Sequence, residues 1–271
     1  MPFISALTAV WVWATYTFGP LSQPVDAHAY WVADPAHLYP NLELARDGYY
    51  YPLPFEYLVA WGRLLPFEAF VALWRAILLA ALVYLAGPLT VFVLFTVPVA
   101  SEINAGNIQI LLALAVVLGF RFPAAWAFVL LTKVSPGVGL LWFAVRREWR
   151  ALGIVTATTA TLVAVSLITH GSQWPSYLEL ITSGQTPSVA PYYASLWIRL
   201  PVSIALVTVG ALGGWRWTVP VAAMLALPVF YIISWSMLVG VLPFARQAAG
   251  RWLARRGITL QRRSVARRQM P

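Results

Sequence analysis

Three polar groups in an otherwise apolar sequence have residue types and spacings that suit chemistry. The first is the segment Asp26-Ala-His-Ala-Tyr30, with Asp34 eight residues beyond Asp26. A carboxylate at a membrane surface can act as a general base that takes the proton of an attacking hydroxyl. The alternative is a solvated acidic loop in which an Asp caps a helix, and spacing alone favours this plainer interpretation.

The second group consists of polar side chains around Gly106, between two apolar runs. Its members are Glu102, Asn104, Asn107 and Gln109. Side-chain amides both donate and accept hydrogen bonds, which suits recognition of sugar hydroxyls. An ordinary turn between two helices explains the same residues equally well.

The third group is Lys133-Val-Ser-Pro136, inside a hydrophobic stretch that holds the only lysine of the chain. A lysine that faces a cavity can hold a phosphate as a point charge. The alternative is a lysine that snorkels to the membrane interface. The nearby proline leaves backbone groups unpaired and slightly favours the cavity.

Other site chemistries find little support. The chain has no Cys, so thiolate ligands and Cys nucleophiles are excluded. Its three histidines, His28, His37 and His170, show no strong ligand spacing, and no phosphate-binding Gly loop is present. We therefore expect no metal and no cofactor. A hard cation held by Asp26, His28 and Asp34 is the weaker alternative.

The elements that position these residues must lie in a membrane. Of the 271 residues, 61% are hydrophobic and 10% are charged, whereas soluble domains carry about 25% charged residues. The composition predicts an all-α protein, a polytopic transmembrane helical bundle. Spans are expected at Phe3–Leu21, Pro66–Gly87, Ala151–Thr169 and Leu200–Trp215, because a span needs about 20 apolar residues. A signal peptide is the alternative for the first.

Several apolar runs are too short for clean spans, which predicts broken or re-entrant helices. Phe55–Leu65 suits a half-span or an interfacial helix, and Pro123–Val145 is long enough to span but contains Lys133. Trp217–Ala245 has 29 uncharged residues, and we expect it to break near Pro228. Broken helices at membrane depth are tolerated where they line a cavity.

Charge predicts the orientation. Eight of the 18 cations lie between Arg246 and Arg268. We expect one transmembrane domain over residues 1–245 and a basic cytoplasmic tail over 246–271, because Lys and Arg mark the cytoplasmic side. The acidic loop Ser22–Pro54 is expected outside. Nucleic-acid binding by the tail is the alternative, but no nucleic-acid module accompanies it. A multi-pass protein of a bacterial plasma membrane is the expectation.

Taken in order, these groups resemble glycosyltransferase family 87, polytopic enzymes of the C-type glycosyltransferase (GT-C) fold. The resemblance covers roughly residues 22–240. Five segments carry it: Asp26 with Tyr30; Tyr49-Tyr50-Tyr51-Pro52; Gly106-Asn107-Ile108-Gln109; Lys133-Val-Ser-Pro136 with the following Arg146-Arg147-Glu148-Trp149-Arg150; and Ser195-Leu196 with Arg199.

The resemblance implies an enzyme that moves a sugar, mannose in the family's commonest theme, from a polyprenyl-phosphate donor. The acceptor is the hydroxyl of a glycolipid or glycan on the extracytoplasmic side, and the configuration inverts. Asp26 is the implied base. Arg199, with Lys133 or His28, is the implied partner of the leaving phosphate. The substrate-binding candidates are His28, Tyr30, Asp34, Tyr51, Glu102, Asn104, Asn107, Gln109, Lys133 and Arg199.

Two alternatives stay open. One is a non-catalytic membrane protein of the same fold that binds or translocates polyprenyl phosphate. The other is a small-solute transporter. Against the transporter, no inverted repeat is visible, and the clearest polar cluster lies outside the membrane rather than at its midplane.

Overall fold

The computed structural model describes residues 10, 13–16, 22–39, 48–182 and 193–255. These residues form helices and turns, and none of them forms a strand. The expected first span, Phe3–Leu21, falls almost entirely outside these ranges. Residues 256–271, which make up most of the expected basic tail, also lie outside them.

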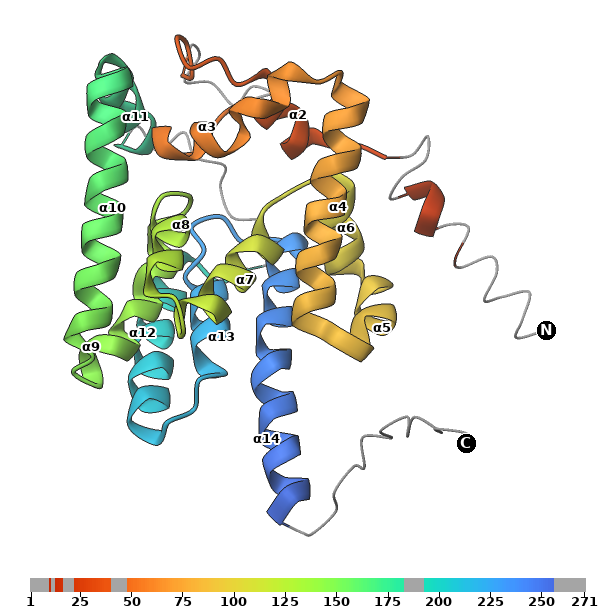
Figure 1. Cartoon of the computed structure of the whole chain (residues 1–271), viewed down its shortest axis with the longest axis vertical. Coiled ribbons are helices and arrows are strands. Elements are labelled where there is room, and N and C mark those ends of the chain that lie inside the picture. Colours follow the sequence, from red (N-terminus) through yellow and green to blue (C-terminus); the bar gives the residue numbers. More distant parts are fainter. Residues whose placement is uncertain (1–9, 11–12, 17–21, 40–47, 183–192, 256–271) are drawn as a thin grey trace, which may run out of the picture.

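Long apolar helices build a bundle whose axes run roughly together (Figure 1). Four stretches are long and apolar enough to cross a membrane: Phe67–Leu94, Trp149–Thr182, Leu196–Gly213 and Ile232–Trp252. A fifth is obtained if the bent pair Val97–Ala105 and Gln109–Gly119 counts as one broken span. The described chain is therefore a polytopic helical bundle, as its composition predicts.

Three of these spans confirm predictions from the sequence. Helix α4 (Phe67–Ala86) continues through η2 (Gly87–Leu89) into α5 (Thr90–Leu94). Helix α10 (Trp149–His170) is followed by η5 (Gly171–Gln173) and α11 (Trp174–Thr182), and α12 covers Leu196–Gly213. The bounds follow the apolar runs, although α4 contains Glu68 and Arg75 and α12 contains Arg199.

The chain breaks near Pro228, as expected. Helix α13 (Thr218–Leu225) ends before the proline, and η6 (Ile232–Val241) begins after it and continues into α14 (Leu242–Arg255). Proline cannot donate a backbone hydrogen bond, so a single long helix would be interrupted here. Helix α14 crosses position 246, where the basic tail was expected to begin.

The run Pro123–Val145 does not form one span. It folds as η3 (Pro123–Ala125), α8 (Trp126–Leu130), η4 (Ser135–Leu140) and α9 (Leu141–Val145). The break from Leu131 to Val134 contains Lys133, and Pro136 lies in the first turn of η4. This stretch is a second interrupted element inside the bundle.

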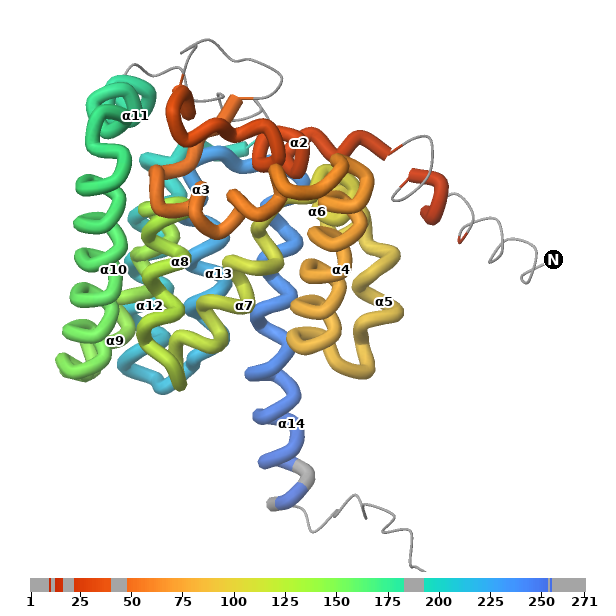
Figure 2. Tube along the Cα trace, turned by 45° about the horizontal axis from the view of Figure 1, so that its top comes forward, coloured from red at the N-terminus to blue at the C-terminus, as the bar shows by residue number. Residues whose placement is uncertain are grey.

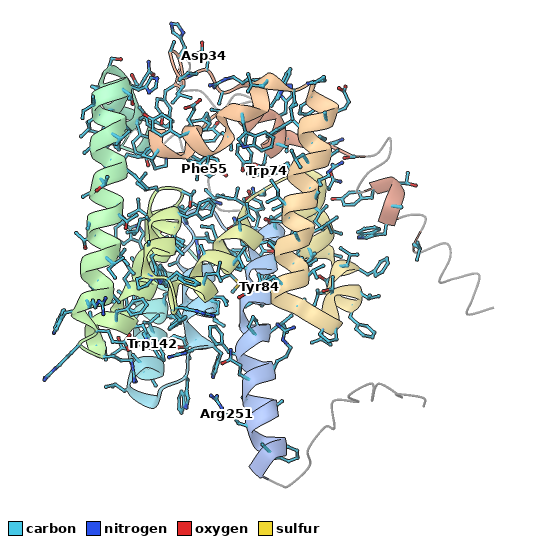
Figure 3. All side chains as sticks on the ribbon, in the orientation of Figure 1. Asp34, Phe55, Trp74, Tyr84, Trp142 and Arg251 are labelled. Carbon is cyan, nitrogen blue, oxygen red and sulfur yellow. The ribbon has the colours of Figure 1, made fainter. Side chains whose placement is uncertain are left out.

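Short helices cover one end of the bundle. Helix α2 (Val25–Val32), helix α3 (Leu53–Val59) and η1 (Ala60–Leu64) lie across the ends of the long helices (Figures 1 and 2). The short apolar run from Phe55 to Leu65 is thus an end-capping pair of helices. Asp34 lies at the outer tip of this layer, whereas Arg251 lies on α14 at the opposite end of the molecule (Figure 3).

Candidate functional site

The site is organised by a sharp bend between α6 (Val97–Ala105) and α7 (Gln109–Gly119). The two helices are bent by 106°. Pro98 lies in the first turn of α6, and Gly106 ends the helix in the left-handed conformation with φ of 72°, which glycine adopts without steric cost. The backbone N–H groups of Gly106 and Asn107 both donate to the Glu102 carbonyl, at 2.9 and 3.2 Å. The turn therefore closes α6 and redirects the chain.

Helix α2 lies directly against this turn. A Cβ atom on Gly106 would come within 2.6 Å of the Ala27 Cβ, so only glycine allows this approach. The indole of Trp74, on α4, donates to the Gly106 carbonyl at 2.7 Å. Ala27 itself is fully buried. The contact brings the residue before it, Asp26, to the bend.

Asp26 accepts a hydrogen bond from the Asn107 side-chain amide, with Oδ2 and Nδ2 2.9 Å apart. The Asn107 Oδ1 atom accepts from the Ile108 backbone N–H at 2.7 Å, which turns the amide N–H toward the carboxylate. The first two polar groups of the sequence, 81 positions apart, thus form one site.

The carboxylate of Asp26 is half-buried, and this environment changes its proton affinity. Burial raises the pKa of Asp26 above its ordinary value, while the hydrogen bond from Asn107 and the charge of Lys133 act in the opposite direction. A carboxylate with a raised pKa is a better proton acceptor than an exposed one.

Lys133 joins the same site from the break between α8 and η4. Its ammonium group interacts electrostatically with the carboxylates of Asp26 and Glu102. Within the described residues it makes no hydrogen bond and no salt bridge at 4.0 Å or less. Lys133 therefore carries a charge near Asp26 that is available to an anion.

Glu102 is fully buried, and both of its carboxylate oxygens accept hydrogen bonds from other groups of the protein. Its Oε1 atom accepts from the Ile110 backbone N–H at 3.0 Å, and its Oε2 atom accepts from the Ser236 hydroxyl at 3.0 Å. Ile110 lies in the first turn of α7, where backbone N–H groups have no partner within the helix. Glu102 thus ties both arms of the bend to η6 and positions Asn107.

Two buried tyrosines, Tyr30 on α2 and Tyr51 just before α3, lie in contact with each other. The hydroxyls of Tyr30 and Tyr51 are 2.9 Å apart, and Tyr39 donates to the Tyr51 carbonyl at 2.6 Å. The Tyr30 ring also packs edge-on against Trp74, at 5.5 Å between centroids. Both candidate tyrosines therefore lie next to the bend, and both interact electrostatically with Asp26.

The other candidates lie around this centre. Asn104 accepts from the Gln23 backbone N–H at 2.7 Å and donates to the Tyr16 carbonyl at 2.9 Å, so it holds the segment before α2. The side-chain amide of Gln109 is buried without a hydrogen-bond partner in the described structure. His28 packs edge-on against Phe67, with the ring centroids 4.9 Å apart.

Asp34 occupies a separate exposed turn. It accepts from the Ala36 backbone N–H at 2.9 Å and pairs with His37 at 3.3 Å. These two interactions hold the pKa of Asp34 below its ordinary value. Within the described residues no three His, Asp or Glu side chains are grouped as a metal site, so the cation alternative finds no ligand set there.

Arg199 binds backbone carbonyls. Its Nε donates to Ala194 at 2.7 Å, and its Nη1 donates to Leu225 at 2.6 Å and Leu227 at 2.9 Å. The guanidinium also lies over the Phe230 ring, 4.7 Å from its centroid. Arg199 thereby connects the start of α12 to the end of α13. The carbonyls that it binds belong to the segment that leads to Tyr231.

Sequence analysis did not select Tyr231, Ser236 or Arg75 for the site. The Tyr231 side chain lies near Asn107 and Asp26 and interacts with them electrostatically, and the Ser236 hydroxyl donates to Glu102. Arg75 binds the carbonyls of Ile103 and Asn104, at 3.0 and 2.8 Å, and so stabilises the C-terminal end of α6. All three residues carry a polar group inside a hydrophobic run of the sequence, and this feature could have identified them as candidates.

The sequence profile of glycosyltransferase family 87 matches residues 49–259, which is most of the chain and includes the bend, Lys133 and Arg199. The chain belongs to glycosyltransferase family 87. Asp26 lies before the matched range, but its hydrogen bond to Asn107 connects it to the family-87 region. No curated protein and no solved structure matches the chain significantly. Membership of family 87 identifies a membrane glycosyltransferase that uses a sugar donor and an acceptor.

Proposed function

We propose that this family-87 protein transfers a sugar, with mannose as the first candidate, from a polyprenyl-phosphate donor to a hydroxyl of a glycolipid or glycan. The layer formed by α2 and α3 faces the extracytoplasmic side of a bacterial plasma membrane, and the basic tail over 246–271 lies in the cytoplasm. The single domain over residues 1–245 has the GT-C fold in this proposal.

One observation carries the assignment: the half-buried Asp26 carboxylate is oriented by Asn107 and has the Lys133 charge nearby. A base and a cation in one site at the end of a membrane-spanning bundle suit a reaction in which a hydroxyl loses a proton and a phosphate leaves. Glu102, the other carboxylate at the bend, is occupied by Ile110 and Ser236 and serves as a positioning residue.

The reaction follows from these positions. Asp26 takes the proton of the acceptor hydroxyl, and the acceptor oxygen forms a bond to the anomeric carbon. The bond between that carbon and the phosphate oxygen breaks, and its electron pair leaves with polyprenyl phosphate. Attack from the face opposite the phosphate inverts the configuration.

The charge that develops on the leaving phosphate requires a cation. Lys133 supplies it, because its ammonium group has no hydrogen-bond partner within the described structure. The phosphate is a good leaving group, so one carboxylate suffices, unlike the paired carboxylates of glycoside hydrolysis. The amides of Asn107 and Gln109 are assigned to sugar hydroxyls.

The test is sugar transfer by the purified protein in nanodiscs, with radiolabelled polyprenyl-phosphate mannose and a panel of glycolipid acceptors. Asp26→Asn keeps the size of the side chain and an acceptor for Asn107 but removes the base. We expect it to lose transfer while retaining the wild-type thermal unfolding midpoint. Glu179→Gln, which removes an exposed negative charge on α11, is the matched control and should retain transfer.

Full transfer by Asp26→Asn would overturn the assignment of the base. A non-catalytic carrier is the second candidate, favoured by the burial of the Glu102 and Gln109 side chains in the site. It predicts saturable binding of polyprenyl phosphate, no transfer with any donor sugar, and no effect of Asp26→Asn on binding.

A further inference from the structure

The end of the bundle opposite to α2 and α3, where α9 lies beside the turn between α12 and α13, carries a basic surface (Figure 1). Its exposed cations are Arg121, Arg146, Arg147, Arg150 and Arg216. Glu148 is the one acidic residue in the segments that form this surface, and it pairs with Arg146 at 3.1 Å. The basic surface therefore keeps a net positive charge.

A pair of aromatic rings holds two of these arginines in place. The rings of Phe120 and Trp142 pack edge-on, with their centroids 5.5 Å apart. The Arg216 guanidinium lies 5.2 Å from the Phe120 centroid, and the Arg146 guanidinium lies 5.4 Å from the Trp142 centroid. Arg146 also donates to the Ala211 carbonyl at 3.0 Å. The ends of α7, α9 and α12 thus meet at one ring pair that carries two guanidinium groups.

Three arginines of the basic surface have unused hydrogen-bond donors. The side chains of Arg121, Arg147 and Arg216 make no hydrogen bond and no salt bridge to any described residue. Arg121 stacks on Phe122, 5.2 Å from the ring centroid, much as Arg216 stacks on Phe120. A guanidinium that stacks on a ring keeps the N–H groups at its edge free, and their geometry matches the oxygen atoms of a phosphate.

Arg147 occupies a backbone position that favours glycine. It follows the C-terminal end of α9 with φ of 58° and is the only described residue other than glycine with a positive φ. The backbone N–H groups of Arg147 and Glu148 donate to the carbonyls of Ala144 and Phe143, at 3.0 and 2.8 Å, which is the pattern of a Schellman C-cap. Arginine is strained at this position. A strained residue whose charged side chain has no partner in the described protein indicates a partner outside it.

Exposed aromatic side chains indicate the kind of partner. They alternate with the arginines along the chain and are Phe122, Trp149, Trp215 and Trp217. Tryptophan is enriched where the hydrocarbon of a membrane meets the lipid head groups. The basic surface therefore has the composition of a region inside the head-group layer, which favours a lipid over an acidic protein as its partner.

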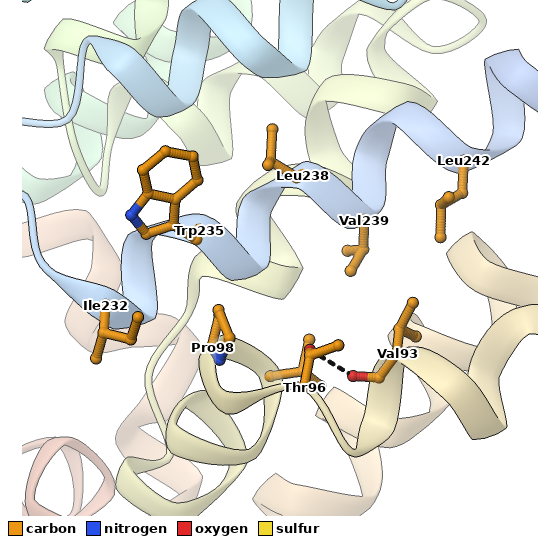
Figure 4. A pocket seen from close by; sticks show the side chains of 9 residues that line it. Val93, Thr96, Pro98, Ile232, Trp235, Leu238, Val239 and Leu242 are labelled. Carbon is orange, nitrogen blue, oxygen red and sulfur yellow. Dashed lines mark hydrogen bonds between the residues drawn. The ribbon is translucent and has the colours of Figure 1, made fainter.

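We propose that the basic surface binds the phosphate of an anionic phospholipid, with Arg121, Arg147 and Arg216 as the donors. A zwitterionic lipid also has a phosphate, but its own cation would then lie among the arginines and be repelled. Binding should therefore select lipids with a net negative charge. The apolar groove along η6 has no charged side chain in its lining and cannot make this distinction (Figure 4).

The test is native mass spectrometry of the purified protein in detergent, titrated with phosphatidylglycerol or with phosphatidylcholine of the same acyl chains. We expect saturable binding of phosphatidylglycerol, about tenfold tighter than that of phosphatidylcholine. Arg216→Gln removes a charge and its stacked guanidinium and should weaken phosphatidylglycerol binding about fivefold. Arg251→Gln is the matched control and should weaken it less than about twofold. Arg251 is an exposed arginine on α14, at the same end of the molecule, and stacks on no described ring (Figure 3).

Arg147→Gly separates loss of the lipid contact from loss of the fold. It removes a charge but relieves the backbone, so the unfolding midpoint in lipid-free detergent should rise while phosphatidylglycerol binding weakens about fivefold. Unchanged binding in this variant would overturn the assignment of Arg147 to the phosphate.

Equal affinity for the two lipids would overturn the proposal, because the contact would then be unselective. Equal losses in Arg216→Gln and Arg251→Gln would also overturn it, because any charge at this end of the molecule would then suffice. The assay requires no sugar transfer, so the proposal stands or falls independently of the proposed function.

Discussion

The Asn107 amide donates to the Asp26 carboxylate across 2.9 Å and fixes it against the bend between α6 and α7. Because this bond stabilises the charged form of Asp26, it lowers a pKa that burial raises. The two effects together set the pH at which the proposed base becomes active.

The acidic limb of the pH profile of kcat/KM should depend on both effects, burial and the hydrogen bond from Asn107. The base acts when deprotonated, so kcat/KM should fall as the pH drops through the raised pKa of Asp26, above the usual value of about 3.9. Asn107→Ala removes a bond to the charged form and should move the limb upward by about one pH unit. The measurement is kcat/KM against pH for both proteins.

Asn104→Ala provides the control for that shift. Asn104 lies on the same helix end but bonds to Gln23 and Tyr16. Its variant should leave the limb at the wild-type pH even if the rate changes. A limb that does not move in Asn107→Ala would show that Asp26 is not the titrating base.

Lys133 should matter through its charge. Lys133→Met removes the cation proposed to hold the phosphate, and a charge-assisted hydrogen bond contributes about 1.5–3 kcal/mol. We expect the donor KM to rise about 10- to 100-fold and the acidic limb to move to higher pH, because the Lys133 charge lowers the pKa of Asp26. Lys133→Arg keeps the charge and should retain most of the donor affinity. Wild-type kinetics in Lys133→Met would indicate a snorkelling side chain instead.

Gly106 and Gly214 form a matched pair for the contact between α2 and the bend. Both are left-handed, with φ of 72° and 73°, but only Gly106 has a close neighbour, Ala27. Alanine should cost about 1–2 kcal/mol of folding free energy at either position for its backbone conformation. Gly106→Ala should cost roughly 1–3 kcal/mol more because the added Cβ meets Ala27.

Thermal unfolding in detergent measures this difference, and transfer activity measures its consequence for Asp26. We expect Gly106→Ala to lose both stability and activity and Gly214→Ala to lose only a little stability. Equal losses of stability in the two variants would mean that α2 does not need its close approach to the bend.

Arg199 should behave as a residue that holds the fold together. Arg199→Lys cannot reach three carbonyls, so we expect a loss of about 2–4 kcal/mol in stability, seen as a lower unfolding midpoint. The donor KM of the folded protein should change less than twofold. A large rise in the donor KM at an unchanged midpoint would instead support direct contact with the leaving phosphate.

Sequence patterns predict the spans and many of the polar residues of the site. They do not predict which of these polar residues contact one another in the fold. Long apolar runs located α4, α10 and α12, and Pro228 located the break after α13, because both depend on local chemistry. The polar interruption around Gly106 is narrower than expected, since Glu102 and Asn104 lie within α6. Residues 101–105 remain helical because the protein itself satisfies these side chains.

The contacts of the site depend on tertiary packing. The sequence singled out Asp26 and Asn107 separately, and only the close packing of Ala27 on Gly106 brings them together. Tyr231 was missed because a single tyrosine in an apolar run is typical of a membrane interface. Arg199 was assigned to the phosphate, and its carbonyl partners at Leu225 and Leu227 could not be foreseen without the packing of α12 on α13.

The tie between Glu102 and Ser236 has a consequence for the order of assembly. Ser236 follows Glu102 by 134 residues, so the ribosome delivers the bend long before its hydroxyl partner. Until η6 inserts, the Glu102 carboxylate has one oxygen without this donor in a region of low polarity. The hydrogen bonds of Glu102 are therefore complete only after the span Ile232–Trp252 has been synthesised and packed against the bend.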